Sequence, residues 1–431
     1  MALTEVLILV LSFLVLLSIG VPVAYSIGLS SALTLIISMP SITAFTTLAQ
    51  RMATGLDSFA LLAIPFFVLS GQLMNRGGIA RRLVDFAKVL VGPLPGGLAF
   101  VNILACMLFG AISGSAAAAA SAIGGFMGPR MEKEGYNKEF SAAINITSST
   151  TGLIIPPSNI LIVYSLASGG VSIAALFMAG YVPGILLGVA LMAVAAVYSM
   201  KRGYKGDSRE SFKEGFKKFF AAFPSLLLLI IVIGGIVAGI FTATEASAIA
   251  VLYTLVLSMI YKEVKVKDLP KILEDSVLTT AIVMLLIGTS MGMSWVMSYE
   301  NIPQEVSNLL IGLSDNPIII LIIINLILLF VGIFMDMTPA VLIFTPIFLP
   351  VVTKLGMDPI HFGIVMVLNL CIGLCTPPVG SVLFIGCSVA NIRIEKVLKP
   401  LIPLFITMIA VLLLVTYVPE LTLWLPRVFG F

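Results

Sequence analysis

Long apolar segments separated by short polar turns fill the chain almost from end to end. The apolar blocks lie at about 6–39, 58–75, 97–128, 140–167, 172–199, 223–261, 277–298, 317–350, 361–390 and 400–418. These blocks are continuous, whereas a membrane β-strand alternates apolar and polar residues over roughly 10 positions. The pattern predicts an all-α integral membrane protein, with roughly 10 to 12 crossings and some re-entrant pieces if each crossing takes about 20 residues.

Composition supports the same class. Of the 431 residues, 59% are hydrophobic and 10% are charged, whereas soluble domains carry about 25% charged residues. Too few charged side chains are present to cover a water-facing surface, so we expect a lipid bilayer around the chain. The net charge is +3 without a basic tail, which does not indicate a nucleic-acid partner. Met1 to Glu5 run directly into the first apolar block, which we interpret as a retained segment because no basic stretch precedes it.

One polar segment divides the chain. Residues 201–222 carry seven Lys or Arg residues between Lys201 and Lys218, and short loops rich in these residues are normally cytoplasmic. The spacing of Phe212, Phe216, Phe219 and Phe220 predicts an amphipathic helix on the membrane face. A solvated connector is compatible with the same pattern.

Glycine and proline recur in the same order on both sides of this connector. At an offset near 221, Pro156-Pro157 coincides with Pro377-Pro378, Gly152 with Gly373, Pro129 with Pro350 and Gly135 with Gly356. With one residue of slippage, Gly110 coincides with Gly332. Repeated membrane units whose helices are interrupted at matching positions are typical of secondary transporters. We therefore predict repeat 1 at 1–200 and repeat 2 at 223–431, inverted if each has an odd number of crossings.

Each repeat contains an apolar block interrupted by small or polar residues. In block 97–128 the interruption is Ser113-Gly114-Ser115, which is poor helix material. This favours a re-entrant helical hairpin with its tip at these residues. A tight contact between helices would also use small residues.

Block 317–350 is the second predicted hairpin, and its interruption contains Asp336, followed by Thr338 and Pro339. An ionisable side chain in the middle of a membrane segment costs at least about 2.5–3.5 kcal/mol on insertion scales. Such residues usually serve an ion, a proton or a substrate. The alternative is that Asp336 caps the helix that begins near Pro339.

The blocks at 140–167 and 361–390 each contain consecutive prolines, Pro156-Pro157 and Pro377-Pro378. Two prolines remove two amide donors and clash with the preceding turn, so we expect the helix to break there. Exposed backbone in a membrane persists only beside protein or a water-filled cavity. Free carbonyls with nearby hydroxyls suit Na⁺, and half-helix N-termini suit a carboxylate. A simple kink is the alternative.

Enzymatic chemistry is not indicated. The chain has no GxxxxGK[ST], HExxH or GxSxG motif, so the sequence predicts neither nucleotide hydrolysis nor an internal enzyme. Cys371 and Cys375 share a helical face, but no histidine or third cysteine lies near them, which favours packing over a metal site. We expect a structural role for His361, which follows Pro359 at a predicted helix start.

Motifs spread over most of the chain resemble the large membrane subunit, the DctM type, of tripartite ATP-independent periplasmic (TRAP) transporters. The matching segments are Leu62 to Phe67, Phe109 to Ser115, Gly152 to Pro157, Phe241 to Ala246, Pro346 to Pro350 and Thr376 to Gly380. The resemblance implies an elevator-type carrier in the bacterial inner membrane, in which the hairpins and broken helices move against a scaffold. It also implies Na⁺ as coupling ion, a small four-helix membrane subunit, and a periplasmic binding protein that delivers an organic acid.

Carried over by motif, the resemblance assigns two sets of site residues. The predicted substrate-binding residues are Ser113, Gly114, Ser115, Ser148, Ser149, Pro156, Asp336, Thr338 and Pro377. The predicted Na⁺ residues are Ser113, Thr151, Gly152, Gly332, Asp336, Gly373 and Thr376.

The second half, from Phe334 to Ala390, is more similar to carriers of sialic acid and sugar acids than to carriers of C4-dicarboxylates, and all three substrates stay open. Many relatives have a polar residue soon after Ser-Gly-Ser, where this chain has Ala116 to Ala120. The alternative function is a stand-alone antiporter that uses Asp336 as a proton or ion site.

Overall fold

A computed structural model describes residues 2–204, 206, 212–314 and 316–431. In these residues the secondary structure is entirely helical, and eight helices are long and apolar enough to cross a membrane. Many large apolar side chains are exposed, as in Leu11, Ile230 and Leu326, because lipid rather than water surrounds such helices. The predicted class, an all-α integral membrane protein, is confirmed.

The first half of the chain contains ten α-helices and two short 3₁₀-helices among the described residues. They are α1 (Ala2–Ser18), α2 (Val23–Ser38), α3 (Ser41–Leu56), η1 (Phe59–Leu62), α4 (Ala63–Arg76), α5 (Ile79–Val91), α6 (Gly97–Ser113), α7 (Ala116–Lys133), α8 (Lys138–Ser149), η2 (Thr150–Leu153), α9 (Asn159–Ala167) and α10 (Ile173–Arg202). The apolar block 6–39 is therefore two helices, separated at Gly20, whose φ is +85°.

The second half follows a similar order. It contains α11 (Phe212–Val237), α12 (Ala243–Ile260), η3 (Val266–Asp268), α13 (Leu269–Tyr299), α14 (Ile302–Leu313), α15 (Pro317–Phe334), α16 (Met337–Lys354), α17 (Pro359–Gly373), α18 (Ser381–Ala390), α19 (Ile394–Tyr417) and α20 (Glu420–Val428). The main difference is that the single long helix α13 takes the place of α3 and α4. The inverted relation of the two repeats stays a prediction.

The predicted connector 201–222 does not form a separate amphipathic helix. Helix α10 ends at Arg202, and the phenylalanines belong to the first turns of α11, which continues without a break through Pro224 to Val237. Phe219 of α11 packs on Phe86 of α5, with 5.8 Å between ring centroids. The apolar face of this segment is thus partly covered by protein. Lys205 and residues 207–211 of the predicted connector lie outside the described residues.

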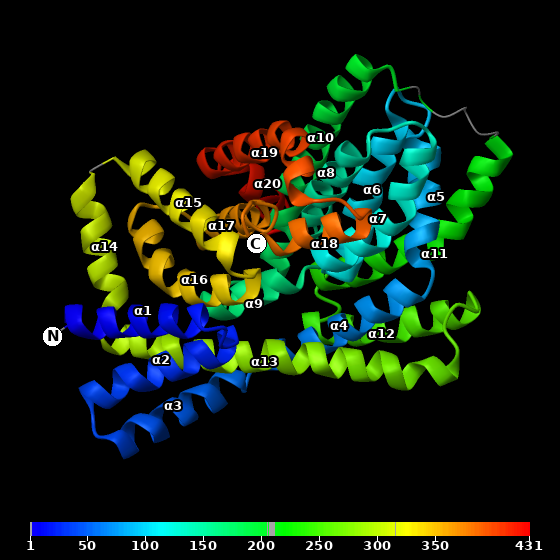
Figure 1. Cartoon of the computed structure of the whole chain (residues 1–431). Coiled ribbons are helices and arrows are strands. Elements are labelled where there is room, and N and C mark those ends of the chain that lie inside the picture. The colour runs from blue at the N-terminus through cyan, green and yellow to red at the C-terminus, as the bar shows by residue number, and fades with distance from the viewer. Residues whose placement is uncertain (1, 205, 207–211, 315) are drawn as a thin grey trace.

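Two groups of helices are visible in Figure 1. The long helix α13 runs along one side, where α2, α3 and α4 pack on it, and α4 also pairs with α12. The second group contains α6 to α10 and α15 to α20, which pack on one another. In the first group, α2 of the first half packs on α13 of the second half, and α12 of the second half packs on α4 of the first. The two halves therefore interlock.

Each predicted hairpin consists of two helices joined by a very short turn, and its re-entry into the membrane stays a prediction. Between α6 and α7 the turn is Gly114, with φ of +61°, and Ser115, which is the N-cap of α7. Between α15 and α16 it is Met335 and Asp336, which is the N-cap of α16. The tips thus lie at the residues that the sequence marks as poor helix formers.

Both helices with consecutive prolines are broken at the predicted positions. Helix α8 tightens into η2 and ends, and α9 starts only at Asn159; likewise α17 ends at Gly373 and α18 starts at Ser381. The Pro156-Pro157 and Pro377-Pro378 bonds are both cis. The break therefore separates a helix C-terminus from a new helix N-terminus in each half.

Each hairpin crosses a broken helix through a pair of glycines. A Cβ atom on Gly152 would lie 2.2 Å from the Gly110 Cα atom, and a Cβ on Gly373 would lie 2.5 Å from the Gly332 Cα atom. In both cases the neighbours are backbone atoms, which cannot rotate away. Packing therefore requires glycine at Gly152 and Gly373, two of the predicted Na⁺ positions, whatever else these residues do. At Gly332, a third predicted position, a Cβ would lie 3.1 Å from the Gly373 Cα atom, which is tight.

We expect Gly152→Ala to lower the free energy of unfolding by about 1–3 kcal/mol, the usual cost of forcing an extra methyl group into a packed interior. Thermal unfolding in detergent measures this. The matched control is Gly125→Ala in α7, where a Cβ would meet nothing within 4 Å. Equal stability of the two variants would contradict the proposed crossing.

Candidate functional site

A cavity of about 260 Å³ lies at the tips of the two hairpins. Eight segments line it: α4, the α6–α7 tip, the end of η2, the first half of α9, α13, the start of α16, the residue after α17 and the start of α18. The lining residues are Ile64, Val68, Gly71, Gln72, Asn75, Ser113, Gly114, Ser115, Ala116, Ala117, Ala118, Leu153, Asn159, Ile160, Val163, Thr279, Val283, Asp336, Met337, Thr338, Leu374, Ser381 and Val382.

Four helices begin at this cavity. The first residues of α7, α9, α16 and α18 are Ala116, Asn159, Met337 and Ser381, and all four line it. The first turn of a helix has unpaired N–H groups and the positive end of the helix dipole, so helix N-termini bind anions. Four of them around one cavity contribute partial positive charge to it, although no Lys or Arg is part of the lining. At the start of α18 the Val382 and Leu383 N–H groups already donate to the Leu374 carbonyl, so this helix contributes mainly through its dipole.

The hairpin tips supply the polar side chains of the interior. The Ser113 side chain is 6% exposed, and its Oγ atom has no hydrogen-bond partner among the described residues. The Ser115 Oγ atom accepts a hydrogen bond of 3.2 Å from the Ala118 N–H group and so caps α7. Asp336 is exposed to the cavity and is the only ionisable residue of its lining. Ser113 and Asp336 are thus free to bind a ligand.

One wall of the cavity comes from α4 and α13, which sequence analysis did not predict. Gln72 and Asn75 of α4 and Thr279 of α13 line it. Neither amide side chain of α4 has a hydrogen bond within the described part of the chain. Polar residues inside the apolar block 58–75 were the available signal. A Cβ on Gly71 would lie 2.9 Å from the Ser113 carbonyl oxygen, so α4 directly contacts the first hairpin tip.

The structure brings together five of the nine predicted substrate-binding residues. They are Ser113, Gly114, Ser115, Asp336 and Thr338. Three residues that follow the Ser-Gly-Ser motif also line the cavity: Ala116, Ala117 and Ala118. At the N-terminus of α7 the Ala118 N–H group already donates to the Ser115 Oγ atom, so the N–H groups of Ala116 and Ala117 are the ones that can serve where a polar side chain is missing.

The other four lie outside the cavity lining: Ser148, Ser149, Pro156 and Pro377. The side chains of Ser148 and Ser149 are fully buried and donate hydrogen bonds to the carbonyls of Ile144 and Ile146 in their own helix, at 2.6 and 2.8 Å. Both prolines lie in the breaks behind the new helix starts. In this structure they shape the site without lining it.

The predicted Na⁺ residues fall into two groups, one for each hairpin. Thr151 and Gly152 lie where the first hairpin crosses α8, and Gly373 and Thr376 lie where the second crosses α17. The hydroxyls donate to carbonyls one turn back, Thr151 to Ser148 at 2.5 Å and Thr376 to Ile372 at 2.7 Å. Their oxygen lone pairs stay available to a cation. Their role as Na⁺ ligands stays a prediction.

His361 and the two neighbouring free cysteines, Cys371 and Cys375, contact residues of other helices. The two ring nitrogens of His361 lie 2.7 Å from the Thr422 hydroxyl and 3.2 Å from the Thr416 carbonyl, which ties α17 to the end of α19 and to α20. The Cys371 and Cys375 thiols are buried and contact the carbonyls of Thr150 and Ile146 in the other broken helix. These contacts agree with the structural roles expected from the sequence.

Related proteins are similar over nearly the whole chain. A Salmonella typhimurium protein named YgiK, described as uncharacterised, is 57% identical over 97% of this chain and 96% of its own length. The isethionate TRAP transporter permease DctMQ of Oleidesulfovibrio alaskensis is 42% identical over 96% of this chain, which spans 65% of that protein. The sialic acid TRAP transporter large permease SiaM of Vibrio cholerae is 39% identical, covering 95% of this chain and 96% of its own length.

Among solved structures, the YdaH transporter of Alcanivorax borkumensis has a similar fold, with a TM-score of 0.65 at 12% identity over 90% of this chain and 88% of that one. The family model described as the tripartite ATP-independent periplasmic transporter DctM component matches residues 10–421. The chain therefore belongs to the DctM family of TRAP transporter large permeases, which are multi-pass proteins of the bacterial inner membrane.

Proposed function

We propose that the chain is the permease of an importer that carries a small organic anion through the cavity between its hairpin tips. The single observation behind this proposal is the meeting of four helix N-termini at a membrane-embedded cavity, because they offer N–H donors and partial positive charge to an anion. A volume of about 260 Å³ suits a small organic acid.

The proposed substrate carries a carboxylate or a sulfonate. Because no guanidinium lines the cavity, recognition does not use the two parallel hydrogen bonds by which arginine selects carboxylates. Backbone and amide N–H donors accept either group. Relatives named for isethionate, sialic acid and C4-dicarboxylates are 42%, 39% and 39% identical, so similarity does not single out the sialic acid branch.

Na⁺ coupling would follow from the charge of Asp336. A carboxylate in a cavity that receives an anion repels it, and at low dielectric the repulsion is strong. A cation bound beside Asp336 removes this penalty, so the anion and the cation would bind together. Hydroxyl and carbonyl oxygens at the two broken helices offer the kind of ligands that Na⁺ takes. A proton on Asp336 would neutralise it too, as in the alternative stand-alone antiporter.

An elevator movement is supported by the two-sided construction of the cavity. One side belongs to the hairpins and broken helices, and the other belongs to α4 and α13. The hairpin tip meets α4 at Gly71, where a missing side chain allows close contact. Sliding of the first side along the second would carry the substrate while its contacts to α4 and α13 change. The family assigns a small membrane subunit and a periplasmic binding protein as partners.

We expect Asp336→Asn to lower uptake at least about tenfold, because a charge-assisted contact worth about 1.5–3 kcal/mol is lost. The variant should also lose the Na⁺ dependence of substrate binding, since the neutral amide no longer needs a cation. Uptake and binding in proteoliposomes at varied Na⁺ measure both. Unchanged Na⁺ dependence would contradict the coupling role of Asp336, and thermal unfolding serves as the control for folding.

Gln72→Leu and Asn75→Leu should each weaken substrate binding about tenfold from the side of the membrane on which this cavity opens, through loss of a hydrogen bond worth about 1.5 kcal/mol. Affinity from the opposite side should change less, because the substrate moves away from α4. Comparing uptake with efflux from preloaded vesicles tests this. Equal losses of substrate affinity in uptake and in efflux would contradict the idea that the substrate moves away from a stationary α4.

Transport should require all three components and a Na⁺ gradient. Reconstitution of the chain with and without the small subunit and the binding protein, using candidate acids that this binding protein retains, measures the requirement. Uptake by this chain alone, indifferent to Na⁺ but abolished by Asp336→Asn, would support the antiporter instead.

A further inference from the structure

A second cavity, of about 190 Å³, lies outside the proposed transport site. It is enclosed by the second half of α7, the first turns of α8 and the end of α18. Its lining residues are Gly124, Gly128, Pro129, Glu132, Lys138, Ser141, Ala142, Asn145, Gly386, Val389, Ala390 and Asn391. None of them lines the first cavity.

The corresponding space in the other half of the protein is filled by Tyr164. This tyrosine is the sixth residue of α9; it lies against Gly363, the fifth residue of α17, and its hydroxyl donates to the carbonyl of Pro359, the first residue, at 2.6 Å. In the pair formed by α18 and α8, the sixth residue of α18 is Gly386 and the fifth residue of α8 is Ala142. Both line the cavity. A Cβ on Gly386 would lie 2.2 Å from the Ile146 side chain, so the close packing of α18 on α8 leaves no room for a ring at this position, and the neighbouring space stays open.

Glycine at position 128 also keeps the space open without a packing reason. Gly128 lies inside α7, where glycine is unfavourable because it loses more backbone entropy than alanine. A Cβ built on it would meet nothing within 4 Å. Protein interiors contain few voids, so an open space of this size next to polar side chains is suited to a ligand.

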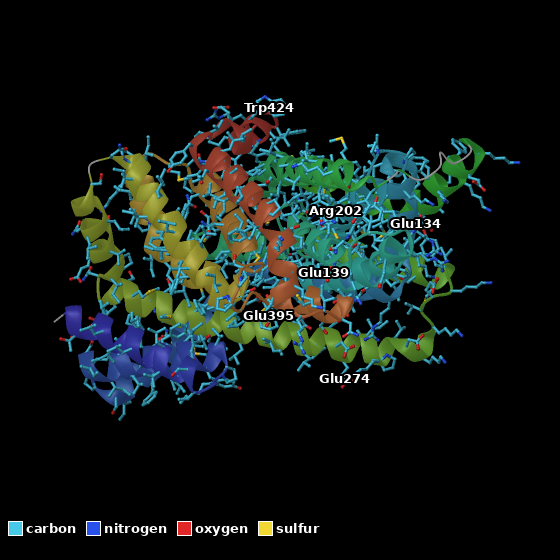
Figure 2. The ribbon with its side chains drawn as sticks, turned by 45° about the horizontal axis from the view of Figure 1, so that its top comes forward. Glu134, Glu139, Arg202, Glu274, Glu395 and Trp424 are labelled. Carbon is cyan, nitrogen blue, oxygen red and sulfur yellow. The ribbon has the colours of Figure 1, made fainter. Side chains whose placement is uncertain are left out.

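The cavity lies beside the polar turn that joins α7 to α8. This turn carries Glu134, and Glu139 follows as the second residue of α8 (Figure 2). Such a polar turn between apolar helices is expected at a membrane surface. Phe126 of α7 and Val389 of α18 are 50% and 36% exposed, as expected for side chains in contact with acyl chains. A ligand that enters here meets headgroup and hydrocarbon together.

The polar lining carries one charge of each sign. Neither the Glu132 carboxylate nor the Lys138 ammonium has a hydrogen bond or an ion pair within the described residues. Deeper in the cavity, Asn145 is 4% exposed and its Nδ2 atom donates to the Ala120 carbonyl at 2.8 Å. Glu132 suits an ammonium group, and Lys138, together with the N-terminus of α8 that it begins, suits a phosphate.

We propose that this cavity binds a zwitterionic phosphoethanolamine group, supplied by phosphatidylethanolamine of the surrounding membrane. The primary ammonium donates to Glu132, the phosphate lies at Lys138, and the acyl chains follow the apolar surface beside Phe126. Phosphatidylcholine fits less well, because its quaternary ammonium has no N–H to donate.

Native mass spectrometry of the full chain released from detergent, with phosphatidylethanolamine, phosphatidylcholine or phosphatidylglycerol added, tests the proposal. We expect phosphatidylethanolamine to bind at least tenfold more tightly than the other two. Gly128→Leu, which fills the cavity, should abolish this preference. The matched control Gly125→Leu lies in the same helix with equally open space but outside the lining, and it should retain the preference.

Glu132→Gln should also reduce binding of phosphatidylethanolamine, whereas Glu134→Gln, outside the lining, should not. Displacement of the lipid by free phosphoethanolamine would support the proposed headgroup site and would show that a soluble molecule with the same group also binds there. Equal retention of the three lipids, or retention of phosphatidylethanolamine by Gly128→Leu at the level of the unaltered chain, would overturn the proposal.

Discussion

The crossing of each hairpin with a broken helix is the contact on which the rest of this structure depends. Gly110 and Gly152 form it in one half, and Gly332 and Gly373 form it in the other. Because backbone meets backbone at these glycines, the tip of each hairpin lies beside the interruption in the broken helix that it crosses. The starts of α7, α9, α16 and α18 then surround one cavity, and backbone groups that would be costly in lipid face each other or that cavity.

The charges at this cavity come from two sources of opposite sign, the positive ends of helices and the carboxylate of Asp336. The helix ends offer partial positive charge, while the single ionisable residue of the lining, Asp336, has the opposite preference. For the anion carrier that we propose, this carboxylate would oppose binding of the substrate alone. Binding of a cation beside Asp336 would remove that opposition, which is the physical basis of the proposed coupling.

The two halves of the chain have a similar order of helices but differ in detail. Tyr164 lies against Gly363 between α9 and α17, whereas Gly386 packs closely on Ile146 of α8 and borders an open cavity. The long helix α13 likewise takes the place of two shorter helices in the first half. If the two halves are repeats, as the sequence predicts, these differences mark positions that the shared arrangement does not itself require.

The sequence by itself determined the membrane class, the positions of both helix-joining tips, the two helix breaks and the place of Asp336 at one of these tips. These features depend on local properties, because apolar length, glycine, consecutive prolines and a charge in an apolar block act wherever they occur. Only the tertiary structure decided that Gln72 and Asn75 line the cavity and that Ser148 and Ser149 do not. The side of a helix that faces a cavity depends on how distant helices pack against it, and in a uniformly apolar chain no alternation of polar and apolar residues reveals that side.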